Sequence, residues 1–229
     1  MTIAERWRAV TARVADACER AGRAPGDVAI IAVSKTQPAD AIRQASAAGA
    51  TEFGENYAQE LAAKLSELAV APPSHPVRWH FIGKLQRNKA RLVAGRVALI
   101  HAVDSVELAE EIARRTQGAV QPILLAVNVG GEASKTGVTV DAAPAIARAL
   151  AAIPGVSLDG LMTMPPPSDA PEASRPHFAG LRALRENLRD SLGRALPVLS
   201  MGMSHDFEVA IACGATHVRI GTAIFGSRA

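Results

Sequence analysis

Short apolar runs alternate with longer amphipathic stretches along nearly the whole chain, and this alternation limits the possible folds more than any other feature. An opening helix is expected over residues 2–21 and can end at Gly22. Between later apolar runs, Pro38 can open a helix, Gly49 can close it, and Ser105 can cap another. Eight apolar runs have strand length, at residues 28–33, 51–53, 79–82, 99–103, 123–127, 157–162, 198–200 and 217–220. Strands that alternate with helices form a parallel sheet, because each crossover needs a long connection.

Eight strand and helix units in 229 residues favour an α/β fold of the closed (β/α)8 type, the TIM barrel. Such barrels typically contain about 250 residues. An open doubly wound sheet is the alternative, but no glycine-rich turn follows the first strand. The chain contains no linker or internal repeat, and its Pro-rich stretch at 164–171 is short enough for a surface loop. We therefore expect a single domain over residues 1–229, a barrel with an N-terminal helix.

Composition and charge narrow the class of protein. A hydrophobic fraction of 48% excludes a mainly disordered chain. No apolar run is long enough to span a bilayer, and the N-terminus lacks the apolar segment of a secretory signal. The two cysteines, Cys18 and Cys213, provide no framework for disulfides or zinc, which is typical of a reducing compartment. A net charge of +3 with 3% aromatic residues argues against nucleic-acid binding. We expect a cytoplasmic protein without membrane or nucleic-acid partners, and a monomer, because no apolar stripe is left unpacked.

A lysine lies where the chemistry of a TIM barrel is expected. Functional residues of this fold follow the carboxyl ends of the strands, and Lys35 directly follows the first strand in VSKTQP. Partial burial there would favour a neutral, nucleophilic amine, which a Schiff-base lysine needs. The alternative is a lysine that extends to solvent from a strand end.

Small residues follow the last two strands. Gly202 and Ser204 come after the seventh strand, and Gly221 and Thr222 after the eighth. Small residues allow backbone N–H groups to approach an anion, and TIM barrels commonly bind phosphate at this place. The alternative is that these glycines only form tight turns. Taken together with Lys35, the pattern indicates a phosphorylated aldehyde cofactor, pyridoxal 5′-phosphate (PLP).

Arg219 in the eighth strand lies beside this predicted phosphate site. Its guanidinium could donate a hydrogen bond to the pyridine nitrogen, but it stays protonated and cannot pass that nitrogen a proton. The ring would then be a poor electron sink. An ordinary salt bridge at the barrel rim is the alternative role.

Several motifs resemble the pyridoxal phosphate homeostasis protein family: AVSKTQP, FGENYAQE, WHFIGKLQRNK, LLAVNVGGEASKTGV, GLMTMPP and SMGMSHDFEVAI, spread in family order over nearly the whole chain. The resemblance implies a barrel similar to the N-terminal domain of alanine racemase, a fold type III PLP protein. It also implies that the cofactor forms a Schiff base with Lys35, and that Ser200, Gly221 and Thr222 hold its phosphate.

The same resemblance assigns further cofactor-binding residues. It places Arg219 at the pyridine nitrogen, Asn56 near the ring or its hydroxyl, and His80 and Met162 at the mouth of the barrel. Family members are regarded as regulators or carriers of PLP without an established turnover reaction. The expected function is therefore intracellular vitamin B6 homeostasis, in which the protein buffers PLP and delivers it to apoenzymes through transient contacts.

A PLP-dependent amino-acid racemase or lyase is the alternative function. Racemisation needs a second base on the opposite face of the substrate, and the chain has a single tyrosine, Tyr57. We accordingly predict no catalytic residue. Lys135 is a hypothetical second acceptor that helps release PLP, with a plain surface lysine as the alternative.

Residues that could suggest other chemistry have structural explanations. No His and carboxylate spacing indicates a metal site. We expect His80 and His101 to be core histidines and Ser204 to cap the helix that follows it.

Overall fold

The computed structural model describes residues 1–131 and 136–226, in which strands and helices alternate along the chain. The strands are β1 (Ala29–Val33), β2 (Glu52–Glu55), β3 (Arg78–Phe81), β4 (Leu99–Val103), β5 (Gln121–Asn128), β6 (Val138–Thr139), β7 (Val156–Met162), β8 (Val198–Ser200) and β9 (His217–Ile220). The α-helices are α1 (Ile3–Arg20), α2 (Ala39–Ala47), α3 (Ala58–Val70), α4 (Val106–Arg115), α5 (Ala143–Ala151), α6 (Arg175–Leu192), α7 (Phe207–Ala212) and α8 (Thr222–Phe225). The 3₁₀ helices are η1 (Pro25–Asp27), η2 (Arg87–Leu92) and η3 (Pro171–Ser174).

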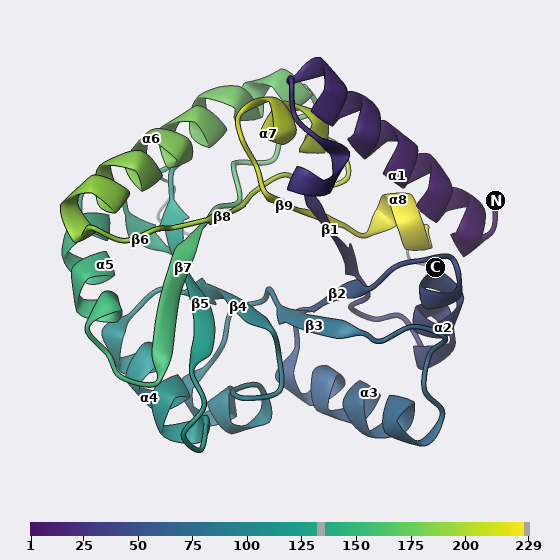
Figure 1. The fold of residues 1–229 in the computed structure, drawn as a ribbon, viewed down its shortest axis with the longest axis horizontal. Helices are drawn as coiled ribbons and strands as arrows, with labels where there is room; N and C mark the ends of the chain where they lie inside the picture. The colour runs from purple at the N-terminus through teal and green to yellow at the C-terminus, as the bar shows by residue number, and fades with distance from the viewer. Residues whose placement is uncertain (132–135, 227–229) are drawn as a thin grey trace.

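Eight of these strands close into a parallel barrel, which confirms the predicted fold. They are hydrogen-bonded in the order β4-β3-β2-β1-β9-β8-β7-β5, and pairing of β4 with β5 closes the ring. The short strand β6 pairs only with β5, so the seventh and eighth barrel strands are β8 and β9. Figure 1 shows the strands around the centre and the helices outside them. All eight predicted strands are present, with ends that differ by at most two residues.

Local signals determine several helix ends, of which those at Gly22 and Ser105 were predicted. The Thr2 side chain caps α1 and pairs reciprocally with Glu5 in a capping box. Gly22 follows this helix with a φ of 66°, a conformation that favours glycine. Ser105 Oγ accepts a hydrogen bond from Leu108 N and caps α4.

The prediction that Ser204 caps a helix is wrong. The N-cap of α7 is Asp206, whose Oδ1 accepts a hydrogen bond from Met203 N at 2.7 Å. The Asp206 carboxylate thus accepts a hydrogen bond within the turn that precedes the helix. The Ser204 hydroxyl instead accepts one from Gly221 N. A second difference is that the connection from β3 to β4 contains the 3₁₀ helix η2 instead of an α-helix.

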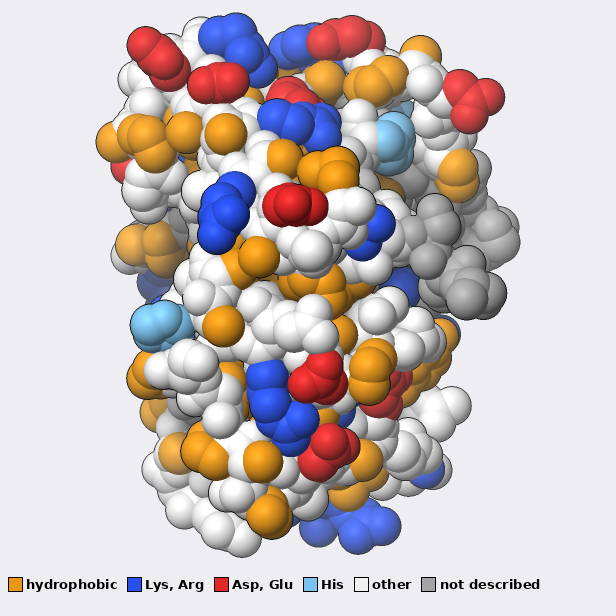
Figure 2. All heavy atoms as spheres, turned by 90° about the vertical axis from the view of Figure 1, so that its right-hand side faces the viewer, with side chains coloured by type: hydrophobic (Ala, Val, Ile, Leu, Met, Phe, Trp, Pro, Cys, Tyr) orange, Lys and Arg blue, Asp and Glu red, His pale blue; other side chains and the backbone are white. Residues whose placement is uncertain are grey.

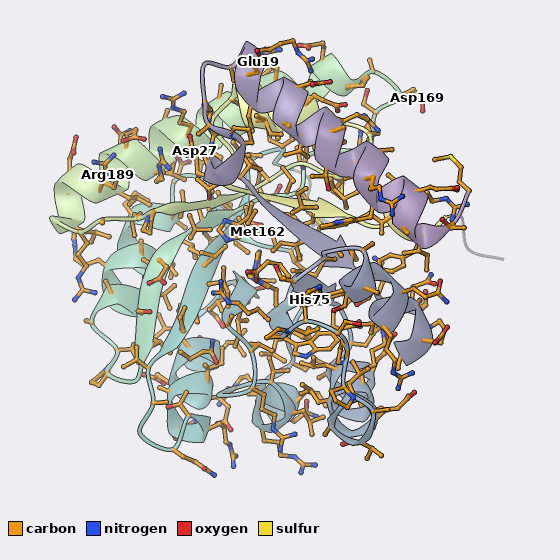
Figure 3. All side chains as sticks on the ribbon, turned by 45° about the vertical axis from the view of Figure 1, so that its right-hand side comes forward. Glu19, Asp27, His75, Met162, Asp169 and Arg189 are labelled. Atoms are coloured by element: carbon orange, nitrogen blue, oxygen red, sulfur yellow. The ribbon has the colours of Figure 1, made fainter. Side chains whose placement is uncertain are left out.

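Two apolar clusters fill the molecule. The larger one lies between the outer face of the strands and the helices, where Phe53, Phe81, Phe178 and Phe207 are fully buried. The smaller one contains residues of β4, β5 and β7, including Met162, and the alternation of side chains along these strands places it inside the barrel. Figure 3 shows Met162 near the centre and charged residues such as Glu19 and Arg189 at the periphery.

The surface carries charges of both signs. On the face shown in Figure 2, Lys and Arg side chains are interspersed with Asp and Glu. None of the described helices combines the length and the apolar character needed to cross a bilayer.

Candidate functional site

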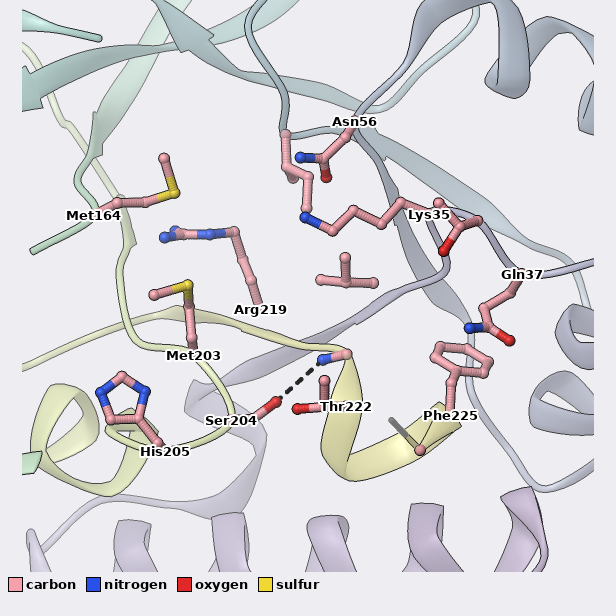
Figure 4. Close-up of a pocket in the computed structure, with 15 residues that line it drawn as sticks. Lys35, Gln37, Asn56, Met164, Met203, Ser204, His205, Arg219, Thr222 and Phe225 are labelled. Atoms are coloured by element: carbon pink, nitrogen blue, oxygen red, sulfur yellow. Dashed lines mark hydrogen bonds between the residues drawn. The ribbon is translucent and has the colours of Figure 1, made fainter. Parts of the chain in front are cut away.

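A cavity of about 320 Å³ opens where β1 and β9 end, at the carboxyl face of the barrel. This volume lies within the range of small-molecule sites, roughly 300–1,000 Å³. Five of the eight predicted cofactor residues line the cavity: Lys35, Asn56, Arg219, Gly221 and Thr222. Figure 4 shows the Lys35 side chain extending across the cavity toward Arg219, whose guanidinium is directed toward Met164.

Lys35 reaches the cavity from the turn that follows β1. Ser34 N donates to Gly54 O at 3.0 Å and anchors the start of this turn on β2. Thr36 has a φ of 64°, which is unusual for a β-branched residue and costs about 1–3 kcal/mol. Its backbone N–H donates to Glu60 Oε1 at 2.5 Å, so a contact from α3 holds the strained residue next to Lys35.

A buried ion-pair network supports this turn from outside the barrel. Lys64 Nζ in α3 lies 2.7 Å from each of Ser34 O, Glu55 Oε1 and Glu60 Oε1. Ser34 Oγ donates to Glu55 Oε1 at 2.6 Å. Burial raises the pKa of Glu55, and the hydrogen bonds from Lys64 and Ser34 oppose that rise. The network ties α3, the end of β2 and the residue before Lys35 into one unit.

Asn56 lines the cavity and carries a buried polar atom without a partner in the described chain. Within the described residues, its Oδ1 is buried without a hydrogen-bond partner, and such atoms in folded proteins usually have one. The backbone beneath it leaves no room for adjustment, since a Cβ added to Gly83 would lie 2.2 Å from Asn56 O. A residue that lines the site therefore carries a hydrogen-bond acceptor that no described group satisfies.

Arg219 is buried in β9 and does not form the alternative salt bridge at the rim. Its Nη1 donates to Ser200 Oγ at 2.6 Å and its Nη2 donates to Thr163 O at 2.9 Å. Within the described chain no carboxylate forms an ion pair with it. Burial lowers the pKa of Arg219 to about 10, so the group remains charged at neutral pH.

At its other end the cavity is lined by Ser204, Gly221 and Thr222, together with the larger side chains of Met203, His205 and Phe225. Ser204 Oγ accepts a hydrogen bond from Gly221 N at 3.3 Å, which joins the loops after β8 and β9 (Figure 4). Gly202 has a φ of 92°, and a Cβ there would lie 2.5 Å from Ala210 Cβ. Thr222 begins α8 and lines the cavity. The first N–H groups of a helix have no acceptor within it, so this end can receive an anion.

The other three predicted residues lie deeper in the barrel and do not line the cavity. Ser200 ends β8 with its hydroxyl bonded to Arg219 and to His101. Met162 belongs to the apolar cluster inside the barrel. His80 is 2% exposed and pairs with His101, so both are core histidines, and His80 does not lie at the mouth of the barrel as the resemblance implied.

Some residues of the site were not predicted. Ser204 was predicted in the small-residue pattern after the seventh strand, and only the additional expectation of a helix cap is wrong. The ion pair between Glu55 and Lys64 could not be recognised from a sequence motif, because the contact depends on how α3 packs against the strands. Lys135 lies outside the described residues. Among the described residues, no group of His, Cys, Asp or Glu is arranged to hold a metal ion.

Comparison with known proteins identifies the family. The family model for the N-terminal domain of alanine racemase matches residues 7–229. The pyridoxal phosphate homeostasis protein of Pseudomonas aeruginosa is 46% identical over 99% of this chain and 96% of its own. That of Aquifex aeolicus is 45% identical over 100% of this chain and 99% of its own. The chain belongs to the pyridoxal phosphate homeostasis protein family.

Solved structures agree with this family assignment. PipY of Synechococcus elongatus, solved with PLP bound, is 36% identical and superposes with a TM-score of 0.84, covering 98% of this chain and 100% of that one. The alanine racemase of Corynebacterium glutamicum has a TM-score of 0.67 at 19% identity, over 96% of this chain and 61% of that one. At that identity the likeness shows the shared barrel alone. Members of the pyridoxal phosphate homeostasis protein family thus share the barrel of alanine racemase.

Proposed function

We propose that this protein binds PLP in the cavity at the end of β1 and β9 and serves vitamin B6 homeostasis. It would hold the cofactor, buffer its free concentration and deliver it to apoenzymes. The observation that carries the proposal is the convergence of Lys35 and Arg219 on one small-molecule cavity in a chain of this family. PLP-bound PipY, a relative of the same length, supports the choice of cofactor.

The residues in the cavity fit PLP at three points. Lys35 supplies an amine, and PLP, when bound, supplies an aldehyde that joins an amine in a reversible covalent bond. The unsatisfied Oδ1 of Asn56 fits a donor such as the ring hydroxyl. Gly221 and Thr222, with the loop that contains Ser204, fit the phosphate.

Arg219 fits the pyridine nitrogen as a donor that cannot give up its proton. Even with its pKa lowered to about 10, it is charged at neutral pH. A guanidinium there leaves the ring nitrogen unprotonated, and this weakens the ring as an electron sink. Storage of the cofactor requires no electron sink, which favours a carrier.

The single tyrosine does not supply the second base that a racemase would need, although His205 lines the cavity. A second base on the opposite face would have to line the same cavity. Tyr57, the single tyrosine, is 55% exposed and is not among the residues that line it. Ser200, His80 and Met162 would act from beneath the cavity, where they shape and hold the groups that touch PLP.

We further infer that residues 1–229 act as one barrel domain with an N-terminal helix, as a monomer in the cytoplasm, without nucleic-acid or membrane partners. α1 supports the first part, since it packs against α2, α7 and α8 and completes the helical ring. Light scattering of the purified protein checks the monomer, and a dimer mass would contradict it.

Absorption spectroscopy followed by borohydride reduction tests the proposal. The protein with added PLP is expected to show a visible band, and peptide mass mapping after reduction is expected to place the adduct on Lys35. Lys35→Ala should remove this adduct, whereas Lys84→Ala, at an exposed lysine outside the cavity, should retain it. No band with excess PLP, or a wild-type adduct spread over several lysines, would contradict the proposal.

Exchange of the amino-acid α-proton in deuterated water separates a carrier from an enzyme. The loaded protein is expected to leave L- and D-amino acids unlabelled. Rapid exchange would show that carriage is an incomplete description.

A further inference from the structure

A continuous chain of hydrogen bonds crosses the interior of the barrel below the cavity. Glu52 Oε2 lies 2.6 Å from His80 Nε2, and His80 Nδ1 lies 2.9 Å from His101 Nε2. His101 Nδ1 lies 2.8 Å from Ser200 Oγ, which accepts from Arg219 Nη1 at 2.6 Å. The chain thus begins at a carboxylate near the amino ends of the strands and ends at a guanidinium in the cavity wall.

Strand positions explain how these five residues meet. Glu52 opens β2, whereas Arg219 lies one residue before the end of β9. The contact between His101 on β4 and Ser200 on β8 joins strands that are not neighbours in the sheet, so it passes through the barrel. His80, His101 and Ser200 are at most 2% exposed, and water has little access to their polar atoms.

The chemistry of the groups gives the chain a direction. Arg219 can only donate, so Ser200 Oγ accepts from it and uses its own O–H toward His101 Nδ1. His101 then donates through Nε2 to His80 Nδ1, and His80 donates through Nε2 to the Glu52 carboxylate. The reverse order would leave the Ser200 proton without an acceptor, and it would require a charged His80 ring or a protonated Glu52.

We propose that Glu52, His80, His101 and Ser200 form a directional relay that positions Arg219 toward the bound cofactor. The relay connects a buried cation to an anion at the far end of the barrel through Ser200, His101 and His80. It also commits the Ser200 hydroxyl to His101, so Ser200 acts as a positioning residue for Arg219. The link to PLP rests on the proposed function, whereas the relay itself belongs to this chain with or without a ligand.

The charges around the relay are consistent with this direction. Burial lowers the pKa of His101 well below its usual value, so its ring is neutral. Burial alone would raise the pKa of Glu52, but the hydrogen bond and electrostatic attraction from His80, followed by the attraction from Arg78, outweigh it and lower the pKa. Two further groups face the relay: His217, whose ring centroid lies 6.0 Å from that of His80, and Asp206, whose charge acts on Arg219.

Nitrogen-15 NMR of the histidine side chains in the ligand-free protein tests the relay directly. At pH 7.5 both His80 and His101 are expected as neutral rings protonated at Nε2. A His101 ring protonated at Nδ1, or at both nitrogens, overturns the relay whether or not the protein binds PLP. The wild-type spectrum needs no variant, so it decides the matter even if a variant fails to fold.

Ser200→Ala tests whether the groups are coupled. It should change the nitrogen resonances of His80, with which Ser200 shares no direct contact. Ser46→Ala, at another fully buried serine outside the barrel, is the matched control and should leave them unchanged. Unchanged His80 resonances in Ser200→Ala would overturn the coupling.

Glu52→Gln tests the link to the cofactor from the far end of the barrel. It is expected to weaken PLP binding about fivefold and to shift the visible band of the bound cofactor, because the guanidinium loses its distant anion. Glu111→Gln, at an ion-paired glutamate in α4, is the control and should do neither. Wild-type affinity and spectrum in a folded Glu52→Gln protein would overturn the link between the relay and the cofactor. Absence of PLP binding in the wild-type protein would instead contradict the proposed function, and the NMR spectrum would then be the test of the relay.

Discussion

Lys64 Nζ lies 2.7 Å from the backbone oxygen of Ser34, the residue that precedes Lys35. The same ammonium group neutralises Glu55, which is fully buried. A charge on α3 therefore contacts the backbone just after the end of β1, where the turn that carries Lys35 begins.

Lys64→Met should destabilise the protein by about 3–5 kcal/mol, because it leaves Glu55 buried without its cation. Urea unfolding measures the change, and Lys84→Met at an exposed lysine is the control. Adding Glu55→Gln to Lys64→Met should recover part of the loss. If Lys64→Met unfolds at the wild-type urea concentration, the network has no role in stability.

Gly83→Ala should weaken PLP binding and destabilise the protein by about 1–3 kcal/mol, since the added Cβ would meet the Asn56 backbone at 2.2 Å. Titration with PLP and thermal unfolding measure the two effects. Gly26→Ala, where the added Cβ meets nothing within 4 Å, should change neither. Equal behaviour of the two variants would show that the backbone at Asn56 can move without loss.

Thr222→Val should weaken PLP binding about tenfold and affect the binding of pyridoxal, which lacks the phosphate, much less. The substitution keeps the shape of the side chain and removes one hydroxyl from the predicted phosphate end of the cavity. Thr11→Val in α1 is the control. An equal loss for both ligands would place the phosphate elsewhere.

The free energy of unfolding should fall as the pH falls below about 6.5. Burial lowers the pKa of His217 to about 4 and that of His101 well below 6.5, so the unfolded chain binds protons that the folded barrel does not. For His217 the stabilisation is present above pH 6.5 and is lost toward pH 4, by at most about 1.4 kcal/mol per pH unit.

Urea unfolding at several pH values measures this dependence. His217→Asn should reduce the slope, and His75→Gln at an exposed histidine should not. Stability that stays constant between pH 7 and pH 5 would mean that the buried rings accept protons in the folded state.

The order of strands and helices could be predicted from the sequence because both signals are local. Apolar runs of strand length and capping residues such as Thr2 and Ser105 act within a few positions of where they stand. Lys35 could be placed at the carboxyl face for the same reason, since a residue that follows a parallel strand must lie at that end.

Contacts between distant segments depended on the tertiary structure. The sequence shows Ser200 after a strand, but closure of the barrel decides that its hydroxyl meets Arg219 and His101. Pairing of β2 with β3 brings Glu52 and His80 together, and the packing of α3 sets Lys64 against Ser34. Local residue patterns thus determined the helices and strands and the end of the barrel that carries Lys35. The tertiary structure decided which polar side chains share hydrogen bonds. The physical reason is that those partners are separated along the chain and meet only across the barrel interior, between paired strands, or between a strand and its helix.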